Sequence, residues 1–98
     1  MTADGGRGDQ VPRRLSIVRF RNQNGTIFVY RDEEGWELSE VAGRIWRLCD
    51  GRRSVREIAD SVAEQFEVEA EVALADTIEF LDDLHHDRLI EWAPAAQT

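Results

Sequence analysis

The sequence predicts a small α+β domain in which a three-stranded antiparallel sheet precedes three helices, in the order βββααα. Two observations lead to this prediction. Segments rich in β-branched and aromatic residues occupy residues 15–39 and are separated by short turns, which is typical of an antiparallel meander. Apolar residues then recur three times at helical spacing between residues 41 and 86.

The strands are expected at residues 15–21, 26–31 and 36–39. The Asn-Gly pair at residues 24–25 joins the first two, because this dipeptide readily adopts the backbone of a two-residue hairpin turn. The sequence DEEG supplies the second turn, so the third strand becomes an edge of the sheet. Alternation places Trp36 and Leu38 on one face of that strand.

Two helices with clear boundaries follow. The first ends near Gly51 and carries an apolar stripe of Val41, Ile45, Leu48 and Cys49. The second begins with a capping box, in which Ser54 caps the helix and the Glu57 side chain reaches back to the cap amide. Its apolar stripe consists of Val55, Ile58, Ala59, Val62 and Phe66.

The third helix, expected at about residues 69–86, carries a wide apolar arc. At about 100° per residue the arc spans roughly 160°, whereas a surface helix buries a stripe of about 100°. Its members are Ala70, Ala73, Leu74, Thr77, Ile78, Phe80, Leu81 and Leu84. One edge of the arc can fill the core while the other lines a groove beside the sheet, or the helix can simply be buried deeply. Residues 89–92 then return as a short extended segment.

Charge is distributed unevenly along the chain, whose net charge is −8. Residues 1–56 contain eleven arginines and eight acidic residues, whereas residues 57–98 contain one arginine and twelve acidic residues. The third helix occupies the position that reads DNA in many winged-helix-like folds, yet no Arg or Lys lies between Glu67 and Asp87. Because DNA affinity depends largely on neutralising phosphates, a duplex should repel this helix. A winged-helix DNA-binding transcriptional regulator is therefore the alternative function, not the preferred one.

Length and composition indicate one small domain in a reducing compartment. The chain has 98 residues, one cysteine and no apolar run near the roughly 20 residues that span a bilayer. Its N-terminus lacks the apolar segment of a secretory signal, so a cytoplasmic protein is expected. We also expect it to be a monomer or a weak dimer. We expect a disordered N-terminal tail at residues 1–13, the folded domain at residues 14–92 and a C-terminal tail at residues 93–98.

Candidate catalytic and metal-binding groups are few. Cys49 is the last residue of an apolar helical stripe, which predicts a buried structural thiol. Asp82 and His86 stand four residues apart, but no third ligand lies at a useful spacing for a metal site. The segment DGRR lacks the lysine and the surrounding pattern of a phosphate-binding loop. We therefore expect no catalytic residue, no metal and no cofactor.

Peptide binding fits the same features better. An open sheet edge can accept another strand, so an extended peptide is expected to pair beside Glu37 and to place side chains against the third helix. Trp36 and Phe80 offer aromatic anchoring area, although each also fits an ordinary core position. Acidic side chains at Glu37, Asp76 and Glu79 favour basic residues in the ligand.

Two runs, residues 45–66 and 76–90, carry a family resemblance. The first contains an apolar helix ending in Asp-Gly-x-Arg-Ser-Val and then an Ile-Ala helix, and the second contains an Asp, a Phe-Leu pair, a Leu and a closing Leu-aliphatic pair. With the segment IFVYRDEEGWELSE, they make about residues 14–92 resemble the PqqD-like peptide-modification chaperones, also called RiPP recognition elements. RiPPs are ribosomally synthesised and post-translationally modified peptides. The matching residues are Asp50, Gly51, Arg53, Ser54, Val55, Ile58, Ala59, Asp76, Phe80, Leu81, Leu84, Leu89 and Ile90.

The resemblance implies a winged-helix-like fold that binds the leader of a precursor peptide as an added strand, between the third strand and the third helix. It also implies docking on a modifying enzyme, either a radical SAM protein or, in lasso-peptide pathways, a leader peptidase and a cyclase. This chain has no cluster-binding cysteines, so an iron–sulfur cofactor would belong to the partner. Carried over by position, the peptide-binding residues are Trp36, Glu37, Leu38, Ser39, Ala73, Asp76, Thr77, Phe80 and Leu84.

Two positions depart from the family pattern. The family's strand before the first helix often ends in Leu-Asn, whereas Leu38 is followed here by Ser39, which can also cap a helix. The family's usual glycine before the closing Leu is Arg88, which predicts a different turn at that point.

Overall fold

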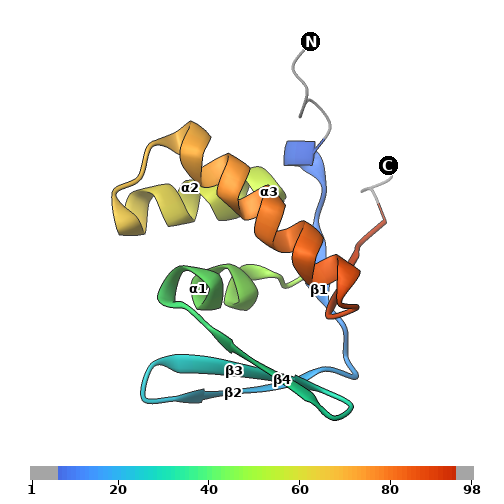
Figure 1. Cartoon of the computed structure of the whole chain (residues 1–98). Helices are drawn as coiled ribbons and strands as arrows, with labels where there is room; N and C mark the ends of the chain where they lie inside the picture. The colour runs from blue at the N-terminus through green and yellow to red at the C-terminus, as the bar shows by residue number, and fades with distance from the viewer. Residues whose placement is uncertain (1–6, 95–98) are drawn as a thin grey trace.

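The computed structural model describes residues 7–94 (Figure 1). Its elements are η1 (Arg7–Asp9), β1 (Pro12–Arg14), β2 (Arg19–Gln23), β3 (Thr26–Arg31), β4 (Glu34–Leu38), α1 (Glu40–Leu48), α2 (Val55–Phe66), α3 (Ala70–His86) and β5 (Ile90–Trp92). The sheet of β2, β3 and β4 forms one side of the molecule, α1 lies next to it, and α2 and α3 pack together beyond α1. A three-stranded sheet followed by three helices confirms the predicted α+β class. Within residues 7–94, no helix is both long enough and apolar enough to cross a membrane.

The larger sheet has the strand order β2-β3-β4, and both pairs are antiparallel. Asn24 and Gly25, which join β2 to β3, have φ angles of 56° and 89°, the positive values predicted for this hairpin turn. Asn22 stabilises the turn, because its Oδ1 accepts a hydrogen bond from the Gly25 N–H at 2.8 Å. In the described part of the chain β4 pairs only with β3, which confirms that it is an edge strand.

The first strand of this sheet is shorter than predicted. β2 begins at Arg19 and not at Leu15, because the chain turns before it: the Val18 N–H donates to the Leu15 carbonyl at 3.0 Å. The turn buries Val18 and leaves Ile17 64% exposed. The incomplete alternation of the segment LSIVRFR therefore reflects a turn followed by a strand.

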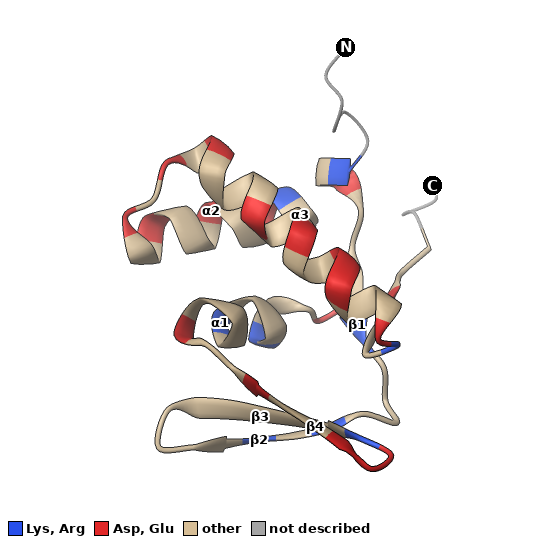
Figure 2. Cartoon of the chain, viewed as in Figure 1, with Lys and Arg blue, Asp and Glu red and all other residues tan. Residues whose placement is uncertain are grey.

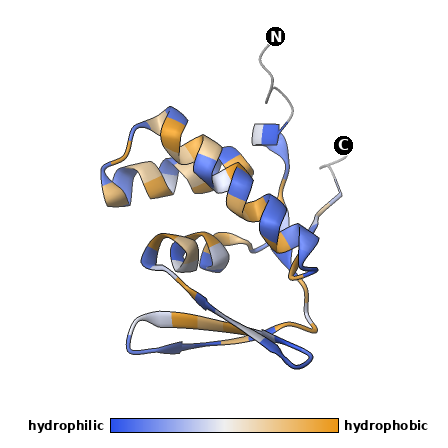
Figure 3. Cartoon of the chain, in the orientation of Figure 1, coloured by the Kyte–Doolittle hydropathy of each residue, from blue (hydrophilic) through white to orange (hydrophobic). Residues whose placement is uncertain are grey.

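The hydrophobic core fills the space between the sheet and the helices. Figure 3 shows hydrophobic residues along β3 and on the inward sides of the helices. Ile27 and Leu38 are cross-strand partners and are both buried, and Trp46 of α1 is 0% exposed. Burying an aliphatic or aromatic side chain of this size stabilises a fold by about 1.5–3 kcal/mol. The core thereby holds α1 between the sheet and the α2–α3 pair.

Local sequence signals fix the helix ends. Ser39 caps α1, because its Oγ accepts a hydrogen bond from the Ala42 N–H at 3.1 Å. The predicted capping box of α2 is present: the Glu57 N–H donates to Ser54 Oγ at 3.1 Å, and the Ser54 N–H donates to Glu57 Oε1 at 2.8 Å. Since Ser39 directly follows β4, its cap brings the first turn of α1 beside the edge strand.

Residues 7–13 contradict the predicted disordered tail. They contain η1 and most of β1, which pairs antiparallel with β5 in a second, two-stranded sheet. The Gly51 N–H donates to the Pro12 carbonyl at 2.9 Å, and the Ala93 N–H donates to the Val11 carbonyl at 2.7 Å. The partners are distant in sequence, so local composition gave no sign of this pairing. The remainder of the two predicted tails, residues 1–6 and 95–98, lies outside the described residues.

Candidate peptide-binding site

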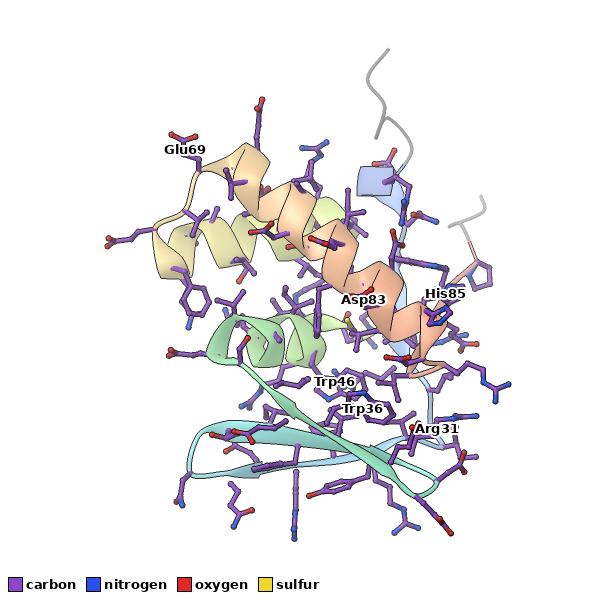
Figure 4. The ribbon with its side chains drawn as sticks, viewed as in Figure 1. Arg31, Trp36, Trp46, Glu69, Asp83 and His85 are labelled. Atoms are coloured by element: carbon purple, nitrogen blue, oxygen red, sulfur yellow. The ribbon has the colours of Figure 1, made fainter. Side chains whose placement is uncertain are left out.

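A pocket of about 320 Å³ lies where β4, the start of α1 and the C-terminal half of α3 meet. Figure 4 shows Trp36 between the sheet and the helices, with Asp83 above it on α3. The pocket is lined by Trp36, Glu37, Leu38, Ser39, Ala42, Phe80, Asp83, Leu84 and Asp87. One wall is thus an edge strand and the opposite wall is a helix.

The backbone of β4 is available to another strand. The two-residue turn after Gln23 makes the pair of Gln23 and Thr26 hydrogen-bonded, and hydrogen bonding then alternates across the sheet. Propagated through β3, this alternation directs the N–H and C=O groups of Trp36 and Leu38 toward β3. Gly35 and Glu37 therefore direct their backbone groups outward, toward the open edge.

The helical wall is one face of α3. The pocket-lining residues of α3 begin at Phe80 and continue three, four and seven residues later, at Asp83, Leu84 and Asp87. This spacing places all four on a single stripe of the helix. The same spacing places Asp76 one turn before Phe80. That turn lies beyond the pocket, because Asp76 is exposed and is not among the lining residues.

A Schellman motif fixes the end of this wall. The Arg88 N–H donates to the His85 carbonyl at 3.0 Å, and the Leu89 N–H donates to the Leu84 carbonyl at 2.9 Å. Arg88 has a φ angle of 62°, in the left-handed region that glycine favours at this position of the motif. Its backbone is therefore one that a glycine would adopt, contrary to the expectation of a different turn.

The pocket combines an apolar floor with an acidic rim. Leu38 and Leu84 are buried, and Trp36 and Phe80 are partly buried against the core. Glu37, Asp83 and Asp87 are exposed, and none of the three forms an ion pair within residues 7–94. Figure 2 shows acidic residues along the outward side of α3. Such a surface suits an apolar side chain flanked by basic ones.

The structure brings together six of the nine predicted site residues: Trp36, Glu37, Leu38, Ser39, Phe80 and Leu84. The other three do not line the pocket. Ala73 and Thr77 are 1% and 0% exposed, because this side of α3 is packed in the core, whereas Asp76 is exposed one turn away. Sequence reasoning missed Ala42, Asp83 and Asp87, although helical spacing from Phe80 would have indicated the two aspartates.

Cys49 lies in the core, away from this pocket. As predicted, it is buried at 0% exposure, and its Sγ donates to the Ile45 carbonyl at 3.2 Å. Burial raises the pKa of its thiol to about 12 despite the nearby charge of Arg14, with Asp50 adding to the increase. Among residues 7–94, no group of three His, Cys, Asp or Glu side chains is placed to hold a metal ion.

Part of this chain is similar in sequence to known proteins. The family model of coenzyme PQQ synthesis protein D (PqqD) matches residues 26–90, which include both walls of the pocket. The PqqA binding proteins of Xanthomonas euvesicatoria pv. vesicatoria (strain 85-10) and Xanthomonas axonopodis pv. citri (strain 306) are each 39% identical to the chain over 54 residues. The alignment covers 55% of this chain and 59% of each relative, less than two thirds of the relatives' length.

Two solved structures have a similar fold. One is the solution structure of the PqqD truncation of Methylobacterium extorquens PqqCD, described as a functional and stand-alone RiPP recognition element. It has a TM-score of 0.73 and 27% identity, and the match covers 86% of this chain and 92% of that one. The other is TbiB1 in complex with the TbiA(β) leader peptide, with a TM-score of 0.73, 21% identity and coverage of 81% and 94%. At that identity, the second likeness speaks for the fold alone.

Proposed function

Because this chain belongs to the PqqD family, we propose that it is a RiPP recognition element: a non-catalytic protein that binds the leader of a ribosomally synthesised precursor peptide. The names of its relatives support the proposal, since two are named PqqA binding proteins and the PqqD structure of 27% identity is described as a RiPP recognition element. The observation that carries it is the open edge of β4 beside a pocket with an apolar floor and an acidic rim.

Strand addition is the proposed mode of binding. An extended leader pairs with the outward backbone groups of Gly35 and Glu37, which extends the sheet by one strand. Side chains of paired residues share a face, so leader residues opposite Trp36 and Leu38 point toward the pocket. A leader residue opposite Glu37 lies on the outer face, beside the Glu37 carboxylate. The preferred leader therefore alternates an apolar anchor with basic residues.

Delivery to a modifying enzyme is the proposed purpose of binding. A bound leader holds the precursor at a high local concentration and in a fixed register when the complex meets the enzyme. The rest of the precursor remains accessible for reaction. The enzyme is a radical SAM protein or, in a lasso-type pathway, a leader peptidase acting with a cyclase.

The pocket and the outward side of α3 also argue against DNA reading, the alternative function. Among residues 7–94 no Lys or Arg lines the pocket, and the exposed positions of α3 include five acidic residues and no Lys or Arg. A helix of this charge would bring carboxylates against phosphates in the major groove. The resulting repulsion opposes the interaction that supplies most duplex affinity.

A titration tests the proposal directly. Isotope-labelled protein is mixed with synthetic leaders from precursor genes in its own gene neighbourhood, and backbone amide shifts are followed by NMR. Binding should perturb residues 34–39 of β4 and residues 80–87 of α3. Shifts that miss both segments with every candidate leader would exclude this site.

A pair of variants on α3 separates binding from folding. Phe80→Asp places a charge on the apolar floor and should weaken leader binding by more than about tenfold, since buried aromatic residues dominate many interfaces. Val72→Asp is the matched control, because Val72 is 47% exposed on the same helix and lies outside the pocket. Both variants should retain the circular dichroism spectrum of the parent. If Phe80→Asp unfolds the chain, Phe80→Ala removes the ring without adding charge.

A further inference from the structure

The second open edge of the sheet, β2, carries the opposite charge to β4. Between Gln10 and Arg31 the chain contains no acidic residue and five arginines: Arg13, Arg14, Arg19, Arg21 and Arg31. Within the described residues β2 pairs only with β3. The sheet therefore exposes two edges, one beside the acidic side of α3 and one beside arginines of β2 and α1, as Figure 2 shows.

A groove follows this second edge between β2 and α1. Two adjoining hollows, of about 380 and 300 Å³, share Asn22, Ile27 and Arg47 as lining residues and so form one continuous depression. Three arginines line it, Arg14, Arg44 and Arg47, together with one acidic residue, Glu40. The groove is thus the cationic counterpart of the pocket beside β4.

Backbone groups are available along this edge as well. Because Gln23 and Thr26 form the hydrogen-bonded pair that closes the hairpin, Gln23, Arg21 and Arg19 direct their backbone groups toward β3. Phe20 and Asn22 therefore direct their N–H and C=O groups outward, and both residues also line the groove. An added strand here would place alternate side chains among the three groove arginines.

The groove arginines form no ion pair with the residues that the structure describes. Neither Arg44 nor Arg47 forms an ion pair within residues 7–94, and Arg44 Nε is buried there without a hydrogen-bond partner. Arg14 is fixed in place, because its Nη1 donates to the Trp46 carbonyl at 2.9 Å and to the Arg47 carbonyl at 3.0 Å. A fixed guanidinium loses little conformational entropy when it meets a carboxylate.

An aromatic side chain is exposed beside these charges, and an aliphatic one is exposed in the turn before β2. Phe20 is 42% exposed in the groove, with the Arg14 guanidinium 5.3 Å from the centre of its ring, and Ile17 is 64% exposed in the turn before β2. Arginine and aromatic residues are enriched where proteins bind one another. This mixture favours a protein partner over nucleic acid, whose contacts are mainly with phosphates.

We infer that the groove between β2 and α1 is a second docking site, which binds an acidic extended segment of the modifying enzyme. The identity of the partner rests on the proposed function. The charge and the lining residues of the groove come from the structure itself. Two inter-strand spacings of about 4.8 Å separate the outer strands, and each edge has its own pocket, so leader and enzyme can be bound together. The leader thereby reaches the enzyme without leaving β4.

Charge reversal at Arg47 tests the inference. The full chain is titrated into the modifying enzyme encoded beside its gene, with and without the leader, by isothermal calorimetry. Arg47→Glu should weaken enzyme binding by roughly tenfold or more, and Arg47→Gln by less, while leader binding to either variant stays unchanged. Arg52→Glu is the matched control, because this substitution makes the same change of charge at an exposed residue that lies outside the groove. Equal losses for Arg47→Glu and Arg52→Glu would overturn the inference.

Two further outcomes would also overturn it. A duplex DNA of 20 base pairs that binds the parent chain and not Arg47→Glu would make the groove a nucleic-acid site. Oligomers of the parent chain that dissociate in Arg47→Glu, seen by sedimentation, would make it a contact between copies of this chain. A parent chain that binds its leader and not the enzyme refutes the docking site and the proposed delivery but not leader recognition, whereas a parent chain that binds the enzyme and no leader refutes leader recognition but not the docking site.

Discussion

The backbone N–H of Leu89 donates to the carbonyl of Leu84 at 2.9 Å and closes the end of α3. Both leucines are buried, at 0% and 3% exposure, so the bond ties the wall of the peptide pocket to the core. Between them Arg88 holds a φ angle of 62°, a conformation that crowds any side chain with a Cβ atom. The end of the proposed binding helix is thus built on a strained residue.

Replacing that residue with glycine should stabilise the fold. We expect Arg88→Gly to raise the free energy of unfolding by about 0.5–1 kcal/mol, because glycine adopts positive φ angles without steric cost. Urea unfolding followed by circular dichroism measures the change. Arg88→Ala removes the same charge and keeps the Cβ atom, so it should not stabilise. Equal gains in the two variants would assign the effect to charge and not to the backbone.

The acidic rim should make leader binding depend on salt. Raising the salt concentration from 0.1 to 1 M shortens the screening length from about 10 to about 3 Å and should weaken the binding of a leader with basic residues. The double variant Asp83→Asn/Asp87→Asn should bind several-fold more weakly at low salt and respond less to added salt. Asp76→Asn should bind like the parent, because Asp76 does not line the pocket. Isothermal calorimetry at the two salt concentrations measures the leader affinity of each variant. An affinity that does not change with salt would contradict an electrostatic contribution of the rim.

Sequence patterns predicted one wall of the pocket better than the other. Alternation in β4 is local and has one solution, so Trp36 and Leu38 were assigned to the correct face. The apolar arc of α3 is wide enough to contact both the core and the pocket beside the sheet. The sequence does not say which edge of the arc faces the core and which faces the pocket. Thr77 packs into the core while Phe80 lines the pocket, so the predicted wall was displaced by about one turn. β1 was missed because its partner, β5, lies at the other end of the chain.

Asp50 should make stability depend on pH in the acid range. Partial burial disfavours its charge, but the backbone N–H groups of Arg52 and Arg53, and then the Arg53 guanidinium, outweigh this and lower the pKa of the carboxyl. Because the pKa is lower in the folded state, the ionised carboxylate stabilises the fold above its unfolded pKa of about 3.9. That contribution is lost as the pH falls through the folded value.

Asp50→Asn should therefore destabilise the chain at pH 7 by about 1 kcal/mol, the usual value of a side-chain cap to backbone N–H groups. The difference from the parent should shrink as the pH falls below the unfolded pKa of about 3.9 and through the lower folded pKa of Asp50, where the parent is also protonated. Urea unfolding at pH 7, 4 and 2.5 gives the profile. Asp60→Asn serves as the control, because Asp60 is exposed and its side chain forms no hydrogen bond to residues 7–94. A constant difference between Asp50→Asn and the parent at all three pH values would contradict this account.

The Cys49 thiol should be inert in the folded chain. Its pKa of about 12 leaves almost no thiolate at pH 8, and 0% exposure keeps reagents from the sulfur. Labelling by a disulfide reagent should therefore proceed only as fast as the fold opens, and should be complete at once in denaturant. The variant Cys49→Ala/Ser16→Cys carries its thiol at an exposed turn residue and should react immediately. Rapid labelling of Cys49 in the native chain would mean that β1 does not stay closed over the end of α1, where the Arg14 N–H donates to the Cys49 carbonyl at 3.1 Å.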